Sequence, residues 1–216
     1  MSYPALLIDT SSRHQIFVRF DAEGRGKFLY RLSEGRSEDI IDQAVDELFG
    51  DVTSIAEIWI GEGPGSFVGL RSSFAYVRML ATLAGTRCRT FYSSRLWRAL
   101  FGLPAGAWFL TRTNARLFYG DRFHEGKREA RVVDLQVAES ALTGSVYCFA
   151  GTWAEAKGKT SALPQADKYC AIEDARLETA VVTEAALALS APRIPGELTP
   201  LYGHELNFTL AKGNNG

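Results

Sequence analysis

The chain has 216 residues and a mass of 23.8 kDa, with 24 basic against 25 acidic residues and a net charge of −1. Hydrophobic residues make up 46% of it, enough to bury a core without disulfides or a structural metal. These values exclude a chain disordered over most of its length and a polybasic binder of membranes or nucleic acid. The length fits one large domain or two small ones.

Cysteine usage and the N-terminus predict a cytoplasmic protein. Cys88, Cys148 and Cys170 are odd in number and scattered, which indicates reduced, buried thiols and no disulfide framework. No basic segment precedes the first apolar run, and no stretch approaches the roughly 18 apolar residues of a transmembrane helix. We therefore expect neither a signal peptide nor a membrane span.

The first half of the chain predicts three consecutive strands followed by alternating helices and strands, from its hydrophobic periodicity. The expected strands are Ala5–Ile8, Gln15–Phe20, Lys27–Leu32, Glu57–Ile60 and Arg89–Tyr92. The expected helices are one that Ser37 caps and Gly50 ends, one from about Leu70 to Ala84, and one that Ser93 or Ser94 caps and that runs to Gly102. Such an order is a mixed α/β arrangement and differs from a Rossmann unit, which would begin β-α-β.

The second half begins at a junction, Leu103–Gly106, and its pattern is weaker. Expected strands are Ala107–Thr111, Leu117–Phe123, Val132–Val133 and Val146–Ala150. Expected helices are Thr152–Lys157 and Leu177–Ser190, with a loop over Gly158–Asp167 between them. Three prolines, Pro192, Pro195 and Pro200, predict an extended C-terminal segment.

The most distinctive segment is a glycine-rich loop between a strand and a helix, with glycines at Gly63, Gly65 and Gly69 and a stiffening Pro64. A helix N-terminus behind such a loop can bind an anion. It is not a Walker A loop, because no Gly-Lys-Ser/Thr follows, and its spacing is one residue too long for a dinucleotide fingerprint. Two interpretations remain, an anion site or a tight turn that lets the helix pack closely on the sheet.

Three motifs, in this order and spacing, resemble the TsaB (YeaZ) family. They are Asp9-Thr10-Ser11, then Gly63-Pro64-Gly65-Ser66-Phe67-Val68-Gly69-Leu70-Arg71, then Ser93-Ser94. Val68 replaces the family's threonine, and Arg36 stands where the family has histidine. Weaker matches are Asn114-Ala115-Arg116 with Tyr119, and Pro200-Leu201-Tyr202. The resemblance is strong over residues 5–100 and weak over 125–195.

This resemblance implies an actin-like ATPase (ASKHA) fold of two ribonuclease-H-like lobes. The first lobe, residues 1–102, would contain a mixed five-stranded sheet. The second, residues 103–210, would be reduced, with the end segment 197–210 packing back on the rest. Residues 211–216 would form a flexible tail.

The resemblance also implies a function. The chain would be a non-catalytic scaffold or activator of the bacterial complex that forms threonylcarbamoyladenosine at adenosine 37 of ANN-decoding tRNAs. Its partners would be the catalytic paralogue TsaD, which holds the metal, the small ATPase TsaE, and a second copy of itself as a homodimer. Contact with tRNA would be indirect or weak. It would have no cofactor of its own, and ATP or ADP would bind, if at all, at the interface with the partner.

The residues themselves predict no catalytic or metal site. His14, His124 and His204 lie far apart and none stands four residues from another, so the His-x-x-x-His pair of the catalytic paralogue is absent. No cluster of His, Cys, Asp and Glu has the spacing of metal ligands. A peptidase is also disfavoured, because Gly65-Ser66-Phe67-Val68-Gly69 misses the Gly-x-Ser-x-Gly spacing by one residue.

Asp9, Thr10 and Ser11 keep a second hypothesis open. Asp9 occupies the position at which actin-like ATPases hold magnesium and phosphate, so these residues could be a residual nucleotide site. The chain would then be a nucleotide-dependent ATPase or phosphotransferase. The other interpretation is a strand turn closed by side-chain hydrogen bonds.

The helix Leu70–Ala84 is apolar nearly all round, so it must be covered on more than one side. We expect a partner subunit on its outer side. The predicted interface residues are Arg71, Phe74, Ala75, Val77, Arg78 and Ala81.

Charge is segregated along the chain. The window Gly63–Gly120 contains eight arginines and no lysine, aspartate or glutamate, while the remainder has 16 basic and 25 acidic residues, a net of −9. Arginine suits protein interfaces and phosphates alike. This window predicts either a basic edge for an acidic partner or tRNA phosphate, or arginines that pair with acids elsewhere in the fold.

Overall fold

The computed structural model describes residues 2–32, 37–112, 117–134, 142, 144–149, 168–170, 175–177 and 182–202. Several predictions fall outside these ranges. They concern Arg36, Asn114-Ala115-Arg116, the helix Thr152–Lys157, the loop Gly158–Asp167, His204, and the tail 211–216.

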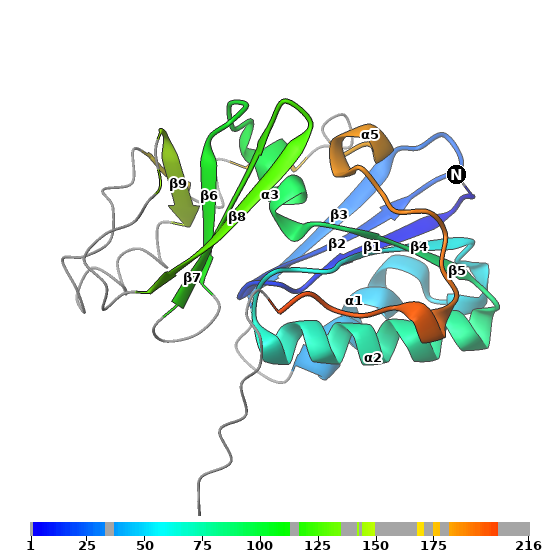
Figure 1. Cartoon of the computed structure of the whole chain (residues 1–216). Helices are drawn as coiled ribbons and strands as arrows, with labels where there is room; N and C mark the ends of the chain where they lie inside the picture. The colour runs from blue at the N-terminus through cyan, green and yellow to red at the C-terminus, as the bar shows by residue number, and fades with distance from the viewer. Residues whose placement is uncertain are drawn as a thin grey trace, which may run out of the picture.

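The first sheet contains five strands in the order β3-β2-β1-β4-β5 (Figure 1). Their bounds are β1 Ala5–Asp9, β2 His14–Phe20, β3 Gly26–Leu32, β4 Glu57–Gly61 and β5 Arg87–Phe91. Strands β1 to β3 form an antiparallel meander, whereas β4 pairs parallel to both β1 and β5. Every residue of β1 and β4 is buried, as expected for central strands covered on both faces.

Helices cover both faces of this sheet. On one face lie α1 (Ser37–Phe49) and α2 (Phe67–Ala84), and on the other lie α3 (Ser93–Phe101) and the short α5 (Glu184–Leu187) (Figure 1). Alternate residues of β1 point to opposite faces, so Leu6 and Ile8 join the core under α1 and α2. Ala5 and Leu7 join the core under α3. Two short 3₁₀ turns, η1 (Val52–Ser54) and η4 (Pro195–Glu197), complete the described elements of this lobe.

The second sheet repeats the connectivity of the first. Its strands are β6 Trp108–Arg112, β7 Leu117–His124, β8 Lys127–Asp134, β9 Val146–Phe149 and β10 Lys168–Cys170, in the order β10-β9-β6-β7-β8. Again three strands, β6 to β8, form an antiparallel meander. Strand β6 also pairs parallel with β9, which in turn pairs parallel with β10. The predicted fold class, an α/β fold with two ribonuclease-H-like lobes and a mixed five-stranded sheet in the first, is confirmed.

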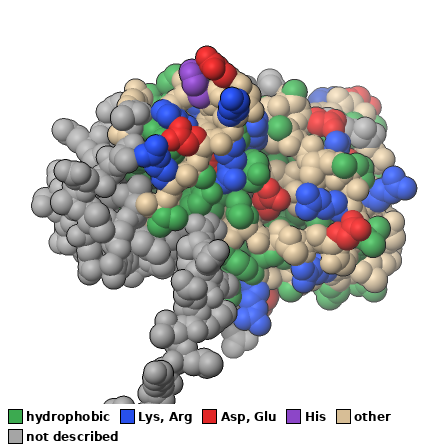
Figure 2. Space-filling view, in the orientation of Figure 1, with side chains coloured by type: hydrophobic (Ala, Val, Ile, Leu, Met, Phe, Trp, Pro, Cys, Tyr) green, Lys and Arg blue, Asp and Glu red, His purple; other side chains and the backbone are tan. Residues whose placement is uncertain are grey.

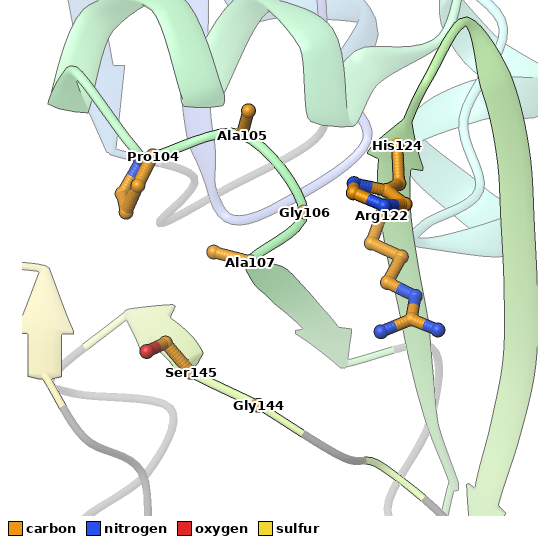
Figure 3. A pocket seen from close by; sticks show the side chains of 8 residues that line it. All are labelled: Pro104, Ala105, Gly106, Ala107, Arg122, His124, Gly144 and Ser145. Atoms are coloured by element: carbon orange, nitrogen blue, oxygen red, sulfur yellow. The ribbon is translucent and has the colours of Figure 1, made fainter.

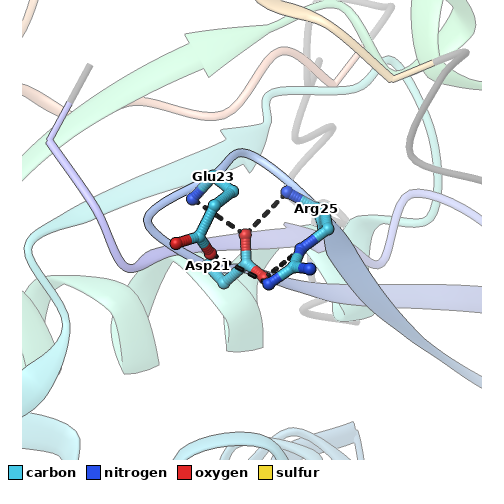
Figure 4. A network of polar contacts seen from close by, with 3 residues as sticks. All are labelled: Asp21, Glu23 and Arg25. Carbon is cyan, nitrogen blue, oxygen red and sulfur yellow. Dashed lines mark hydrogen bonds and ion pairs between the residues drawn. The ribbon is translucent and has the colours of Figure 1, made fainter.

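The hairpin between β2 and β3 shows how local polar chemistry fixes strand register. The carboxylate of Asp21 accepts hydrogen bonds from the backbone N–H groups of Glu23 and Arg25, at 3.0 and 2.8 Å. It also forms an ion pair of 2.8 Å with the Arg25 guanidinium, which reaches Glu23 as well (Figure 4). Gly24, at φ +75°, takes the left-handed position that the turn requires.

Two predicted helix starts were wrong. Helix α2 begins at Phe67 and not at Leu70, because the Ser66 hydroxyl accepts a hydrogen bond from the N–H of Gly69 and so turns the end of the glycine loop into the first helical turn. Ser93 is already inside α3, and its hydroxyl accepts from the N–H of Gly63 rather than capping its own helix.

The predictions for the second half were less accurate. The helix over Leu177–Ser190 was wrong, because Thr183 is extended and caps the short α5, which ends at a left-handed Ala188. The chain then pairs with β5, where Ser190 exchanges hydrogen bonds with Thr90. Strand β8 was expected at only two residues, because its charged, exposed side chains lack a hydrophobic pattern, and β10 was not predicted.

We expect Ser66→Ala to lower the free energy of unfolding by about 1 kcal/mol, because it removes the side-chain cap of α2. Chemical denaturation monitored by circular dichroism measures the change. Thr82→Ala, an exposed substitution within the same helix, is the control and should be neutral within about 0.5 kcal/mol. Equal stability of Ser66→Ala and the wild-type protein would contradict the cap.

Candidate functional site

The glycine loop is a point of close backbone packing between β1, β4, α2 and the C-terminal segment. A Cβ on Gly65 would lie 2.0 Å from the carbonyl oxygen of Ser11, and one on Gly69 would lie 2.3 Å from that of Thr10. A Cβ on Gly63, at φ +94°, would lie 2.5 Å from the carbonyl oxygen of Leu201. Each of the three glycines is therefore required by contact with another backbone segment.

Hydrogen bonds hold the same contacts. The N–H of Ser66 donates to the carbonyl of Ser11 at 2.6 Å, and the Thr10 hydroxyl donates to the carbonyl of Gly69 at 2.9 Å. The N–H of Gly63 donates to the Ser93 hydroxyl at 3.1 Å. Because protein groups already occupy these donors, the N–H groups of Gly63, Ser66 and Gly69 are not directed at a vacant anion site.

Asp9 lies beneath the loop and has no solvent-accessible surface. Its Oδ1 accepts hydrogen bonds from the N–H and hydroxyl of Ser11, at 3.2 and 2.8 Å, which closes a tight turn after β1. A Cβ on Gly61 would lie 2.1 Å from Oδ2, an atom that has no hydrogen-bond partner in the described part of the chain. Burial raises the pKa of Asp9, and the polar groups of Ser93, Ser11 and Trp97 offset only part of the rise.

The structure thus brings the sequence motifs Asp9-Thr10-Ser11, Gly63–Gly69 and Ser93-Ser94 together at the ends of neighbouring strands. It brings them into a packed junction. The Asp9 carboxylate is buried within this junction and bonds to Ser11, which fits the turn interpretation of Asp9, Thr10 and Ser11.

A second polar cluster joins α3 of the first lobe to the β7–β8 hairpin of the second. Asp121 is almost fully buried, and its carboxylate forms an ion pair of 2.9 Å with Arg128. The Arg128 guanidinium also lies 3.8 Å from the ring centre of Tyr92, while that of Arg95 lies 3.9 Å from the ring centre of Phe123. Each lobe therefore places a cation over an aromatic ring of the other.

Burial raises the pKa of Asp121, whereas Arg128, Ser94 and Arg98 act to lower it. The sequence analysis did not find this cluster. The sequence signal for this cluster is that Tyr119, Asp121 and Phe123 occupy every second position of one strand. Their side chains therefore share one face of the strand, with an acid between two aromatic residues.

Two other hollows carry no assigned chemistry. One, of about 320 Å³, lies between the Pro104–Ala107 turn and β7, from which the side chains of Arg122 and His124 project toward it (Figure 3). Arg122 already pairs with Glu129. The other, of about 560 Å³, lies at the edge of β5 and contains Arg89, which pairs with Glu184.

The predicted interface residues divide between the inside and the outside of the molecule. Phe74, Val77 and Ala81 are buried in the core beneath α2, so their assignment to a partner surface was wrong for this conformation. Arg71, Ala75 and Arg78 are exposed. The sequence alone did not show which of these residues lie on the inner side of α2 and which on the outer side, because apolar residues occur on nearly every side of the helix.

The outer side of α2 carries an apolar row, which we call the α2 stripe. It consists of Val68, Ala75, Met79 and Leu83, in which Val68, Met79 and Leu83 are 63%, 52% and 70% exposed. Three of the six large hydrophobic side chains exposed in the described part of the chain lie here. Exposed apolar residues aligned on one helix are typical of a protein interface.

Most arginines of the basic window have internal partners. Arg89 donates to the carbonyl of Ser190 at 2.8 Å, Arg98 holds the carbonyls of Pro104 and Ala107, and Arg95 packs on Phe123. Acidic and basic side chains are interspersed over the face in Figure 2. Of these three arginines, only Arg89 forms an ion pair with an acid, Glu184, so the prediction that the arginines pair with acids is confirmed for Arg89 and not for Arg95 or Arg98. Because all three contact groups within the fold, they do not form a continuous basic edge.

Histidines and cysteines lie apart from one another. His14 hydrogen-bonds Tyr30 at 2.7 Å and packs against Phe149, whereas His124 lies on the exposed β7–β8 hairpin. Cys88 and Cys148 are buried free thiols, as predicted. Among the described residues, no three His, Cys, Asp or Glu side chains are grouped so that they could hold a metal, and no helix is long and apolar enough to cross a membrane.

We expect Gly65→Ala to lower the free energy of unfolding by about 3 kcal/mol, because the added methyl group overlaps the Ser11 backbone. Thermal and urea denaturation measure the loss. Gly196→Ala is the matched control, since nothing lies within 4 Å of the added Cβ, and it should leave stability unchanged or slightly raised. Tolerance of alanine at residue 65 would show that the contact is looser than described.

We expect Asp9→Asn to be more stable than the wild-type protein at pH 7, by about 1 kcal/mol. The folded pKa of Asp9 lies above the ordinary value of 3.8, so the folded chain binds the proton more tightly and wild-type stability falls as pH rises between the two values. The advantage of asparagine, which keeps an Oδ1 acceptor, should therefore shrink toward pH 4.

The control for this measurement is Asp51→Asn. Hydrogen bonds from Thr53 lower the pKa of Asp51, so its loss should act in the opposite direction and destabilise the protein at neutral pH. Denaturation curves between pH 4 and 8 test both variants. An Asp9→Asn protein no more stable than the wild type at pH 7 would refute the effect.

Comparison with known proteins identifies the fold. No family model matches the sequence, and no curated protein sequence matches it. Two solved structures from Pseudomonas aeruginosa are similar over nearly the whole chain. YeaZ has 17% identity and a TM-score of 0.63 over 92% of this chain and 98% of its own. An uncharacterised protein described as similar to the peptidase YeaZ has 19% identity and a TM-score of 0.61 over 93% and 99%. The chain therefore has the YeaZ fold along its length.

Proposed function

We propose that this protein is a TsaB-type, non-catalytic subunit of the cytoplasmic complex that forms threonylcarbamoyladenosine on tRNA. In this role it pairs with a larger catalytic paralogue of the TsaD type and stabilises that partner's active conformation. The YeaZ fold supports the proposal, as does the order of the three motifs that meet at the glycine loop.

The observation that carries the proposal is the α2 stripe. Its side chains make this helix apolar on the outside as well as the inside, although α1 and the sheet already cover its inner face. An exposed apolar row of this kind lowers its free energy when another protein covers it. The catalytic paralogue is the expected occupant, and a second copy of this chain is an alternative in its absence.

The non-catalytic role is supported by the packing around Asp9. Its carboxyl group is buried, and the neighbouring N–H donors of Gly63, Ser66 and Gly69 bond to protein groups. A nucleotide in the complex would instead occupy the interface with the partner. The competing function, an autonomous ATPase or phosphotransferase, requires an open site at Asp9.

We expect the double variant Met79→Glu/Leu83→Glu to bind the paralogue at least tenfold more weakly, because two carboxylates would be buried in an apolar contact. Both side chains are exposed, so the variant should fold. Ala130→Glu/Val132→Glu is the control, because it makes the same change of two negative charges on exposed, uncharged residues of β8. Affinity is measured with the purified paralogue from the same genome, and threonylcarbamoyladenosine is quantified by mass spectrometry in cells in which the variant replaces the wild-type gene.

The expected result is loss of both binding and modified adenosine for the α2 variant but not for the control. Wild-type protein that neither binds the paralogue nor affects the modification would refute the proposed function. Tight binding of ATP or ADP by the isolated chain, abolished by Asp9→Asn, would establish the competing function instead.

A further inference from the structure

A groove of about 360 Å³ lies between α2 and the C-terminal segment. The helix contributes one wall and the residues after η4 contribute the other. The lining residues are Phe67, Arg71, Phe74, Ala75, Arg78, Pro200 and Tyr202. The groove borders the α2 stripe, with which it shares Ala75.

The walls of the groove are held in place by specific contacts. The Arg78 guanidinium donates to the carbonyl of Leu198, and the rings of Phe67 and Tyr202 pack at 4.8 Å between centroids. The N–H of Leu201 donates to the carbonyl of Glu62 at 2.6 Å. The C-terminal segment therefore runs antiparallel to α2 (Figure 1). The contacts of Leu198 with Arg78 and of Tyr202 with Phe67 attach it at both ends of the groove.

The electrostatic character of the groove is positive. Among the described residues that line it are two arginines and no acidic residue. Arg78 is engaged with Leu198, whereas Arg71 is exposed and makes no ion pair or hydrogen bond within the described part of the chain. The acidic side chains of α1 lie on the other side of α2, where Glu38 accepts from Ser72 and Asp42 accepts from Tyr76.

We propose that this groove is an anchor site for an acidic segment of the partner protein. A carboxylate of the partner pairs with Arg71, and an adjacent apolar side chain packs between the Phe67–Tyr202 pair and Ala75. The inference rests on the proposed function, because it specifies where and by what chemistry the catalytic paralogue is held.

The lining distinguishes a protein segment from nucleic acid. Five of the seven residues are apolar or aromatic, and a phosphodiester chain would require several cations along its path rather than one available guanidinium. The volume lies near the lower limit of ligand pockets, about 300 Å³, which suits one or two side chains of a protein. An arginine beside buried aromatic rings is also a frequent composition of interface hot spots.

The test uses full-length protein and the purified paralogue, with affinities measured by calorimetry at low and physiological salt. Arg71→Glu reverses the charge of the groove, and Ala75→Trp fills it without changing any charge. Arg87→Glu is the matched control, because Arg87 is an exposed arginine of β5 outside the groove. Melting temperatures establish that each variant is folded.

We expect Arg71→Glu and Ala75→Trp each to weaken binding at least tenfold, and Arg87→Glu to change it less than twofold. The affinity of the wild-type protein should fall with rising salt, and that of Arg71→Gln should fall less steeply. If the wild-type protein binds the paralogue and either Arg71→Glu or Ala75→Trp binds it with an affinity within twofold of the wild-type value, the anchor site is overturned and the proposed function is left intact. If the wild-type protein does not bind the paralogue, both the anchor site and the proposed function are overturned. Binding of a bare tRNA probe by the wild-type protein, lost in Arg71→Glu, would assign the groove to nucleic acid instead.

Discussion

The whole first lobe depends on the close approach of the glycine loop to two other backbone segments. Gly65 and Gly69 lie against the carbonyls of Ser11 and Thr10, and Gly63 lies against that of Leu201. Any side chain larger than hydrogen would separate β1 from the start of α2. This contact sets how deeply α2 lies on the sheet, and hence which of its residues enter the core.

The same contact decides the chemistry of the site. A loop before a helix N-terminus can present its N–H groups to a phosphate only when those groups are vacant. Here the N–H groups of Gly63, Ser66 and Gly69 bond to Ser93, Ser11 and Ser66 respectively, and the carboxyl group of Asp9 is buried beside Gly61. An arrangement that resembles a phosphate-binding loop in sequence therefore joins strands and helix, and the exposed apolar residues of α2 lie on its outer side.

Sequence reasoning succeeded where local pattern and structure coincide. The apolar run of β1 and the caps at Gly50 and Gly102 follow from short-range rules. It failed where tertiary contact decides. Phe74 and Met79 are equally apolar, yet one is in the core and the other is exposed, and only the depth of α2 separates them. Likewise, β8 is rich in charged residues but forms a strand because its backbone pairs antiparallel with β7.

The junction of the lobes shows why near-neutral net charge is compatible with a specific charged contact. Arg95 and Arg128 each cross from one lobe to an aromatic ring of the other, around the buried Asp121. Side chains thus occupy the contact between α3 and the β7–β8 hairpin. Arg89, Arg95 and Arg98 are held by contacts within the fold, so their guanidinium groups are not available to pair directly with a partner. Arg71 is exposed and lies beside the apolar α2 stripe, where a charged group contributes to the specificity of a contact.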